Sequence, residues 1–303
     1  MKRPSAACTR IRRAVQILVA ALFVASPLAA GRALVGAARG AETPTSVPAD
    51  LPFWGTLSSS QVGPVTLLDP FAAVQAMAAS LSADPSWLVA TVPVVAFYGL
   101  VRARAFCGWV CPVNLVLELV DALRRKLGLE VSERVVPRRA KMGAALGIVA
   151  GSAIVGIPLF EAVSPLSALN KFIVVGSLVG AITLTLIVAA ELLWGHRVWC
   201  RSLCPLGGFY QTLGRIGVVR IGIDADACTR CGRCKKACLA DPEILDPAIY
   251  RGKSTVDAGD CMICGACIDA CPERALRYTA CIPCSALLDP FTLSATNEKE
   301  VSR

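Results

Sequence analysis

Four stretches of the chain are almost entirely apolar, and a fifth is apolar but short. The four long stretches are residues 14–38, 86–101, 142–160 and 172–194. A helix needs about 20 largely apolar residues to cross a bilayer, and these stretches approach that length. The fifth, residues 70–81, is too short to cross, so we expect it to lie on the surface or to re-enter. The pattern predicts an α-helical membrane domain over residues 14–217, with four transmembrane helices arranged as two repeated hairpins.

The start of the chain allows two interpretations. A basic segment at residues 1–13 precedes the first apolar stretch, and the sequence Leu28-Ala29-Ala30 lies within that stretch. These features are typical of a cleaved signal peptide. The apolar run is longer than the core of a usual signal, which favours a retained helix. We therefore expect residues 1–13 to form a cytoplasmic N-terminus.

The composition agrees with a membrane protein. Of the 303 residues, 55% are hydrophobic and only 17% are charged, whereas soluble domains average about 25% charged residues. This balance excludes an ordinary cytosolic globular protein. It also excludes a disordered chain, which would be rich in charge and poor in apolar residues.

Lysine and arginine are unevenly distributed between the apolar stretches. The N-terminal segment contains Lys2, Arg3, Arg10, Arg12 and Arg13, and the segment after the second stretch contains Arg102, Arg104, Arg124, Arg125, Lys126, Arg134, Arg138, Arg139 and Lys141. The segment after the first stretch has Arg39 alone. Because basic loops stay in the cytoplasm, the distribution predicts a multi-pass protein with both termini cytoplasmic. The membrane that we expect for it is the bacterial inner membrane. The distribution also accounts for the net charge of +9 without a nucleic-acid partner.

After the last apolar stretch the chain becomes polar and rich in cysteine, over residues 218–280. Two runs there have the spacing C-x2-C-x2-C-x3-C. They are Cys228, Cys231, Cys234 and Cys238, then Cys261, Cys264, Cys267 and Cys271. This spacing is typical of a bacterial-type ferredoxin domain with two [4Fe–4S] clusters, in which the fourth cysteine of each run binds the other cluster. We therefore expect a small α+β domain here, placed in the cytoplasm, and a C-terminal tail at residues 281–303.

The spacing assigns the eight cysteines to two sets of iron ligands. The first cluster is predicted to bind Cys228, Cys231, Cys234 and Cys271, and the second Cys238, Cys261, Cys264 and Cys267. Structural zinc is the alternative, but a zinc ribbon pairs two C-x2-C halves across a longer gap. No catalytic acid, base or nucleophile accompanies the cysteines, so their predicted role is electron transfer.

A different cysteine motif occurs twice, after the second and after the fourth apolar stretch. Residues 104–112 and 197–205 both have the pattern R-x-aromatic-C-x3-C-P, and their cysteines are Cys107, Cys111, Cys200 and Cys204. Cysteines four apart lie on one face of a helix, so two such faces would bring four thiolates to one site. Three interpretations remain open: a third metal centre with iron–sulfur or copper, a thiol–disulfide function, or cysteines that only pack.

Four further residues are weaker candidates. Glu191 and His196 lie near the end of the fourth apolar stretch and could accept protons from a quinol. Otherwise, Glu191 reaches towards water and His196 is an interfacial side chain. Cys281 and Cys284 form an isolated C-x2-C pair, which is either half of a site shared with a partner or a pair of idle thiols.

These features together resemble the NapH/MauN family of ferredoxin-type membrane proteins. The likeness covers residues 10–280 and includes the four predicted spans, both C-x3-C-P motifs and the tandem cluster runs. Residues 106–114, with residues 123–129 after them, are similar to the nitrate-reductase members. Residues 57–60, followed by Asp69-Pro70, are similar to the same members.

The resemblance implies a quinol dehydrogenase membrane component of the periplasmic nitrate reductase type. The implied partners are the membrane, the quinone pool, a periplasmic ferredoxin-type or multihaem cytochrome subunit, and a terminal redox enzyme. The alternative is an assembly or maturation factor that supplies electrons for cofactor insertion into a redox enzyme of the methylamine dehydrogenase or copper-oxidase type. In both cases the protein is an electron carrier with two [4Fe–4S] clusters.

Overall fold

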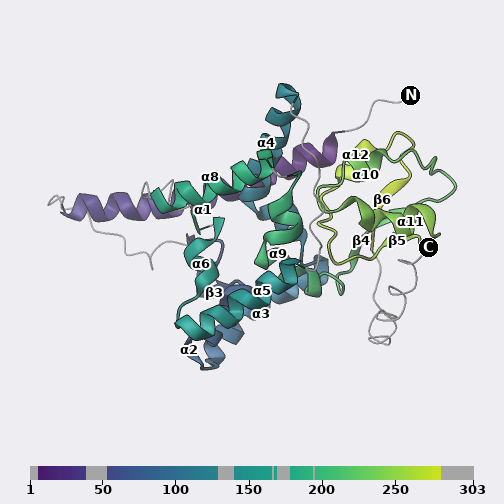
Figure 1. Ribbon diagram of the computed structural model, residues 1–303. Helices are drawn as coiled ribbons and strands as arrows, with labels where there is room; N and C mark the ends of the chain where they lie inside the picture. Colours follow the sequence, from purple (N-terminus) through teal and green to yellow (C-terminus); the bar gives the residue numbers. More distant parts are fainter. Residues whose placement is uncertain are drawn as a thin grey trace.

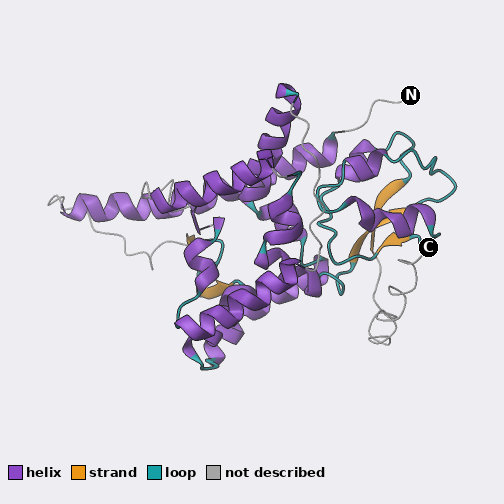
Figure 2. Cartoon of the chain, viewed as in Figure 1, coloured by secondary structure: helices purple, strands orange, loops and turns teal. Residues whose placement is uncertain are grey.

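The computed structural model divides into a helical part, formed by the described residues between 7 and 213, and a smaller ferredoxin-like part, formed by residues 219–280 (Figure 1). It describes residues 6–38, 53–128, 140–165, 167–168, 178–193 and 195–280. Cys281 and Cys284 lie outside these ranges, as do residues 1–5 and the rest of the C-terminal tail. Helices dominate the first part, whereas short strands, short helices and long loops make up the second (Figure 2).

The helical part consists mainly of helices and includes one small three-stranded sheet. Its α-helices are α1 (Ala7–Ala38), α2 (Pro70–Ser80), α3 (Pro85–Val101), α4 (Pro112–Leu127), α5 (Ala140–Val155), α6 (Leu159–Val163), α8 (Leu178–Leu193) and α9 (Pro205–Leu213). Two π-helical turns are η2 (Phe106–Val110) and η3 (Trp199–Leu203). Strands β1 (Phe53–Gly55), β2 (Ser59–Val62) and β3 (Val65–Leu68) pair antiparallel in sequence order.

No helix in the described ranges is both long enough and apolar enough to cross a membrane. The prediction of a four-helix transmembrane domain is therefore wrong. Helices α3, α5 and α8 have 17, 16 and 16 residues, fewer than the roughly 20 that a span requires. Residues 172–177, with which the fourth apolar stretch begins, lie outside the described ranges.

Local signals explain why one apolar stretch gives two shorter helices. Helix α5 ends at Val155, and the next residue, Gly156, has a φ of +75°. Pro158 then precedes α6 as its N-cap. Glycine readily adopts a positive φ and proline cannot continue a helix, so the chain turns between residues 155 and 159. Apolar character continues through this turn, which is why residues 142–160 look like one helix in sequence.

Helix α2 belongs to the core of the helical part rather than to its surface. Asp69 caps its first turn, since its carboxylate accepts hydrogen bonds from the main-chain nitrogens of Phe71 at 3.1 Å and Ala72 at 3.0 Å. The Phe71 ring is buried and meets Phe160 edge to face, with 5.5 Å between ring centroids. Helices α2 and α9 both pack on α5. A surface position, one of the two expected for residues 70–81, is therefore wrong for the first half of α2.

The ferredoxin-like part is built on a second antiparallel sheet with short helices beside it. Strand β4 (Val219–Ile223) lies between β5 (Thr255–Val256) and β6 (Leu276–Ala280). The helices are α10 (Arg233–Lys236), η4 (Pro242–Leu245), α11 (Asp246–Tyr250) and α12 (Ala266–Ala270). Ile221, Val256 and Leu276 are buried in one cluster with most of the cysteines. The core of this part is therefore small and surrounds the predicted cluster sites.

Buried arginines join the two parts. Arg102, just after α3, donates hydrogen bonds to three main-chain carbonyls: Val219 and Val256 at 3.3 Å each and Ala258 at 2.6 Å. Arg102 is 1% exposed. A guanidinium has five N–H donors, so this one side chain can satisfy carbonyls of β4, of β5 and of the loop that follows β5.

A second junction is centred on the buried carboxylate of Asp260. Arg104 reaches its Oδ1 at 2.7 Å, Lys141 pairs with the same oxygen, and Gln211 donates to Oδ2 at 2.8 Å. Arg104 and Lys141 are both almost fully buried. The distribution of lysine and arginine places these residues in a basic loop between apolar stretches, and it does not predict that they are buried. They are ion-pair partners at an interface within the protein.

Helix α1 also contacts both parts. Asp269 of α12 accepts hydrogen bonds at the start of α1, from the main-chain nitrogens of Cys8 at 3.2 Å and Thr9 at 2.8 Å. One turn later Arg12 pairs with Glu118 of α4, and both are buried. The N-terminal half of α1 is therefore fixed against the ferredoxin-like part and α4.

Candidate functional site

Four of the predicted iron ligands line one pocket of the ferredoxin-like part. They are Cys228, Cys231, Cys234 and Cys271. Cys228 and Cys231 lie in the loop before α10, Cys234 lies in α10, and Cys271 follows α12. Gly232 has a φ of +71° and turns the chain into α10, a conformation that glycine adopts without strain. The structure thus brings together the four cysteines that the spacing assigns to one cluster.

The other four predicted ligands are buried in the apolar core of the same part. They are Cys238, Cys261, Cys264 and Cys267. Burial raises the pKa of the Cys238 thiol to about 12, and the nearby Cys264 and Cys261 add to the rise. Cys238 therefore lies beside the second cysteine run, although it comes from the first. Gly265, with a φ of +74°, leads into α12 as Gly232 leads into α10.

The donor chemistry of both sets fits a [4Fe–4S] cubane. Burial raises the pKa values of Cys234 and Cys267, and neighbouring cysteines raise them further because thiolates repel one another in apolar surroundings. A cationic iron core would offset that repulsion. In the described part of the chain, no three His, Cys, Asp or Glu side chains meet closely enough to bind a single metal ion. A cubane does not require this, since each thiolate binds a different iron.

Both C-x3-C-P motifs adopt the same local structure. In each, the first cysteine lies in a π-helical turn and the second is the N-cap of the next helix: Cys111 before α4 and Cys204 before α9. The main-chain nitrogen of Cys111 bonds to the oxygen of Phe106 at 2.9 Å, and that of Cys204 to Trp199 at 2.8 Å. Proline follows because the first helical position needs no N–H donor. The spacing of four predicts that the two cysteines of a motif lie on one face of an α-helix, and this prediction is wrong. One lies in a π-helical turn and the other caps the next helix.

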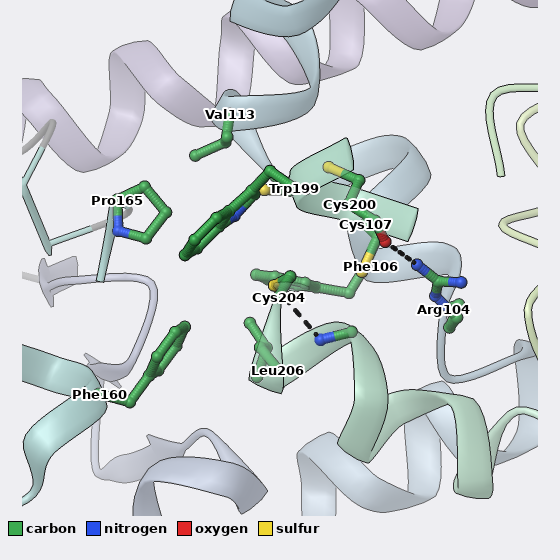
Figure 3. Close-up of a pocket in the computed structure, with 12 residues that line it drawn as sticks. Arg104, Phe106, Cys107, Val113, Phe160, Pro165, Trp199, Cys200, Cys204 and Leu206 are labelled. Atoms are coloured by element: carbon green, nitrogen blue, oxygen red, sulfur yellow. Dashed lines mark hydrogen bonds between the residues drawn. The ribbon is translucent and has the colours of Figure 1, made fainter. Parts of the chain in front are cut away.

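The four motif cysteines nevertheless line one pocket (Figure 3). They are Cys107, Cys111, Cys200 and Cys204. The rings of Trp199 and Phe160 and the side chain of Leu206 form apolar walls. At the edge of the pocket Arg104 donates to the carbonyl oxygen of Cys200 at 3.1 Å, and the main-chain nitrogen of Gly207 donates to the sulfur of Cys204 at 3.4 Å.

Burial makes three of the motif thiols difficult to ionise. Burial raises the pKa of Cys204 to about 12, and it also raises the pKa values of Cys111 and Cys200. Thiol–disulfide exchange requires a thiolate, which is favoured by electropositive and partly exposed surroundings. The pocket therefore suits metal binding or packing better than thiol–disulfide exchange.

The first motif contacts the loop that carries two cysteines of the second set. The indole Nε1 of Trp109 donates to the main-chain oxygen of Ile263 at 3.0 Å, and Ile263 lies between Cys261 and Cys264. Gly108 approaches the same loop so closely that an added Cβ would lie 2.6 Å from the main-chain oxygen of Met262. A glycine is therefore needed where the two loops meet.

The second C-x3-C-P motif also contacts main chain next to the second set of cysteines. The Nε of Arg201 donates to the main-chain oxygen of Ala240 at 2.7 Å, two residues after Cys238. Arg104, which begins the first motif, bonds to Asp260, the residue before Cys261. Both motifs thus hold the main chain next to the second set of cysteines.

Glu191 and His196, the sequence candidates for proton transfer, lie in a buried polar group behind the second motif. Glu191 accepts hydrogen bonds from the main-chain nitrogens of Arg197 at 2.5 Å and Trp199 at 3.2 Å. His196 Nδ1 lies 2.8 Å from Asp121 Oδ1. Arg197 has a φ of +58°, an unfavourable value for a residue with a side chain. These contacts stabilise the turn that begins the second motif, and neither candidate is among the residues that line its pocket.

One polar pair in the helical part was missed by the sequence analysis. The hydroxyl of Tyr210 donates to Oδ1 of Asp69, 141 positions away in the chain. Burial raises the pKa of Asp69 to about 6, although the hydrogen bond from Tyr210 opposes the rise. The sequence Asp69-Pro70 is a signal for a helix start, but nothing in it points to Tyr210.

Two protein-family models match the cysteine-bearing regions. A model described as a 4Fe-4S dicluster domain matches residues 220–272, and one described as a 4Fe-4S binding domain matches residues 83–130 and 177–224. Each of the latter two matches contains one C-x3-C-P motif and no other cysteine. No solved structure matches the chain.

Most of the chain also aligns with curated ferredoxin-type proteins. It is 35% identical over 272 residues to the methylamine utilization ferredoxin-type protein MauN of Methylorubrum extorquens, covering 89% of this chain and 88% of that protein. The chain belongs to the NapH/MauN family. The ferredoxin-type protein NapH of Escherichia coli is 32% identical over 229 residues, or 74% of this chain and 79% of its own length. The NapH/MauN resemblance is thus confirmed, and the protein is a ferredoxin-type electron-transfer protein that binds [4Fe–4S] clusters.

Proposed function

We propose that this NapH/MauN-type protein takes electrons from a quinol and passes them to a redox partner protein. Oxidation of a quinol to a quinone releases two electrons and two protons. Bound iron–sulfur clusters supply one-electron carriers for such a reaction. The task of the chain is to hold these carriers between the donor and the acceptor.

The eight ferredoxin cysteines hold two [4Fe–4S] clusters in this proposal. Support comes from the pocket lined by one predicted set and from the common burial of the other set. The first cluster uses Cys228, Cys231, Cys234 and Cys271, and the second uses Cys238, Cys261, Cys264 and Cys267. Each run contributes one cysteine to the other run's cluster, Cys238 and Cys271, and this exchange ties the two halves of the domain together.

The observation that carries the proposal is the contact between the first C-x3-C-P motif and the second cluster site. Trp109 donates to Ile263, and Gly108 lies directly on Met262. The motif cysteines Cys107 and Cys200, the second cysteine set and most of the first set therefore pack in one hydrophobic cluster. An arrangement of this kind favours transfer of electrons in sequence, from the helical part into the ferredoxin-like part.

The first cysteine set lies at the exit of this path. Cys231 is exposed, and exposed Arg230, Arg233 and Lys236 surround it in sequence. A basic surface attracts an acidic partner and speeds its association. We propose that a ferredoxin-type or multihaem cytochrome protein with an acidic surface docks here and accepts the electrons.

The motif pocket is assigned to a third iron–sulfur centre. Both matches of the 4Fe-4S binding model fall on the segments that carry Cys107, Cys111, Cys200 and Cys204, and these segments hold no other cysteines. The apolar walls of the pocket disfavour free thiolates. A bound cationic core would stabilise them, which supports a metal centre over thiol–disulfide exchange.

The direct test is reduction of the cluster-loaded full chain by a quinol. The protein is mixed anaerobically with a short-chain menaquinol, and the visible absorbance of the clusters is followed with time. The proposal predicts bleaching together with formation of the quinone. Dithionite is the control, since it reduces iron–sulfur clusters directly. Bleaching by dithionite but not by any quinol would overturn the proposed donor.

The alternative is an assembly factor that supplies electrons for cofactor insertion into a redox enzyme of the methylamine dehydrogenase or copper-oxidase type. The chain is more similar to the methylamine utilization proteins, at 35% and 33% identity, than to the NapH of E. coli, at 32%. A maturation role predicts that the partner enzyme stays active when this protein is removed after the enzyme has matured. An electron-transfer role predicts that enzyme activity supported by quinol stops at once, while activity with an artificial donor continues.

A further inference from the structure

A cavity of about 450 Å³ lies in the helical part, beside the first C-x3-C-P motif. Side chains of α1, α3, the first sheet and η2 line it, and most of them are apolar, including Phe23, Val94 and Phe97. Small-molecule sites are commonly cavities of about 300–1,000 Å³ with apolar walls and a few polar groups. This cavity has the size and the apolar walls of such a site.

Few polar groups line the cavity, and one of them is a carboxylate with an acceptor position still available. Asp69 and Tyr210 both line the cavity, with Tyr210 donating to Asp69. Within the described ranges of the chain, the other donors to the Asp69 carboxylate are the main-chain nitrogens of Phe71 and Ala72. An ionised carboxylate offers about four acceptor positions. One position thus remains for a ligand that brings its own donor, such as a hydroxyl group.

Aromatic rings connect the cavity with the motif pocket. Tyr98 lines the cavity and meets Phe106 at 5.8 Å between centroids, with the ring planes at 89°. Phe106 lines both the cavity and the pocket that holds the four motif cysteines. A ligand in the cavity is thus separated from that pocket by a single side chain.

We infer that this cavity binds the quinol, with Asp69 accepting a hydrogen bond from one ring hydroxyl. The inference rests on the proposed function, to which it adds the location and the residues of the donor site. The apolar walls suit a substituted aromatic ring with a hydrocarbon tail, and the carboxylate selects the hydroxylated form. A purely hydrocarbon ligand would leave the Asp69 carboxylate buried without a donor in that position, which is unfavourable.

Binding to the full chain is measured by calorimetry with a short-chain menaquinol and, separately, with the quinone. Val94→Trp fills the cavity from α3, whereas Val92→Trp places the same ring on the exposed side of the same helix. We expect Val94→Trp to weaken binding of both forms by at least about tenfold, and Val92→Trp to leave it unchanged. Asp69→Asn is expected to weaken binding of the quinol more than that of the quinone, since an amide is a poorer acceptor. Visible absorbance of the clusters shows that each variant is folded.

The outcomes separate this inference from the proposed function. If menaquinol reduces the parent protein and Val94→Trp at equal rates, the donor function stands and the cavity assignment is overturned. If the quinone binds the parent but not Val94→Trp, while no quinol reduces the clusters, the cavity assignment stands and the proposed function fails. Equal binding to the parent, Val94→Trp and Val92→Trp contradicts the inference whatever the reduction rates are.

Discussion

The indole nitrogen of Trp109 lies 3.0 Å from the main-chain oxygen of Ile263 and donates a hydrogen bond to it. This bond links a C-x3-C-P motif to the loop between two predicted iron ligands. Trp109→Phe keeps an aromatic ring but removes the donor. The Ile263 oxygen keeps the hydrogen bond from the Tyr278 hydroxyl at 3.2 Å, so the variant loses one of two hydrogen bonds, which costs about 0.5–1.5 kcal/mol. We predict a lower free energy of unfolding by an amount in that range, with slower reduction of the clusters by quinol. Unchanged unfolding and reduction would show that the contact does not couple the two loops.

Gly108 provides a steric test of the same contact. A Cβ at this position would lie 2.6 Å from the main-chain oxygen of Met262, whereas one at Gly99 would meet nothing within 4 Å. We predict that Gly108→Ala destabilises the protein by about 1–3 kcal/mol, as overpacking of a close contact does. Gly99→Ala is the matched control and should be neutral or slightly stabilising, since alanine favours a helix. Thermal unfolding followed by circular dichroism compares the two. Equal melting temperatures would contradict the close approach of the loops.

Asp260 is the centre of the buried ion-pair group between the two parts. Asp260→Asn leaves Arg104 and Lys141 without their carboxylate. Breaking a buried pair in this way costs about 3–5 kcal/mol. Asp257, which pairs with Arg220 at 2.6 Å and is 39% exposed, is the control, and Asp257→Asn should cost less than about 1 kcal/mol. Chemical unfolding of both variants measures the difference. A small effect at Asp260 would show that the interface does not depend on its charge.

Stability should depend on pH through Asp69, whose pKa is raised from 3.8 to about 6 by burial, with a smaller contribution from Glu161. A raised carboxyl pKa means that the folded state prefers the protonated form. The stabilisation is complete below about pH 4 and is lost as the pH rises through 6. Between pH 5 and pH 7.5 we predict a loss of about 1 kcal/mol relative to Asp69→Asn, which cannot titrate. Urea unfolding of both proteins at the two pH values tests this, and a parallel pH dependence of the two would contradict it.

The iron content of the protein should depend on the four motif cysteines. Replacement of all four by alanine should remove about four iron atoms per chain if they hold a cubane. The replaced residues are Cys107, Cys111, Cys200 and Cys204. The electron paramagnetic resonance signals of the ferredoxin clusters, which should persist, show that the variant is folded. The same iron content in the parent and the variant would exclude a third iron–sulfur centre and favour packing or thiol chemistry.

The ferredoxin-like part and the family could be predicted because ligand spacing has a strict physical cause. Three cysteines of each run must reach three different irons of one cubane, and Gly232 and Gly265 must turn the chain there, whatever the rest of the protein does. The family is confirmed by the aligned relatives. The division of the ligands into two sets stays a prediction, and the positions of Cys228, Cys231, Cys234 and Cys271 support it.

The helical part was harder to predict because an apolar run does not show where its helices begin and end. The turn at Gly156 and Pro158 divides a stretch that has the composition of one long helix. Arg102 and Arg104 have the pattern of loop charges but are buried partners of the ferredoxin-like part. The pair of Asp69 and Tyr210 joins residues too far apart in the chain for any local pattern to reveal.

The most direct test of the account is an iron count on two single variants, Cys234→Ser and Cys267→Ser. Iron, acid-labile sulfide and low-temperature paramagnetic resonance after dithionite are measured on the anaerobically reconstituted full chain. The account predicts that each variant loses about four iron atoms and the signal of a different one of the two ferredoxin clusters. A parent protein that binds zinc in place of iron, with no labile sulfide and no signal after dithionite, would contradict it.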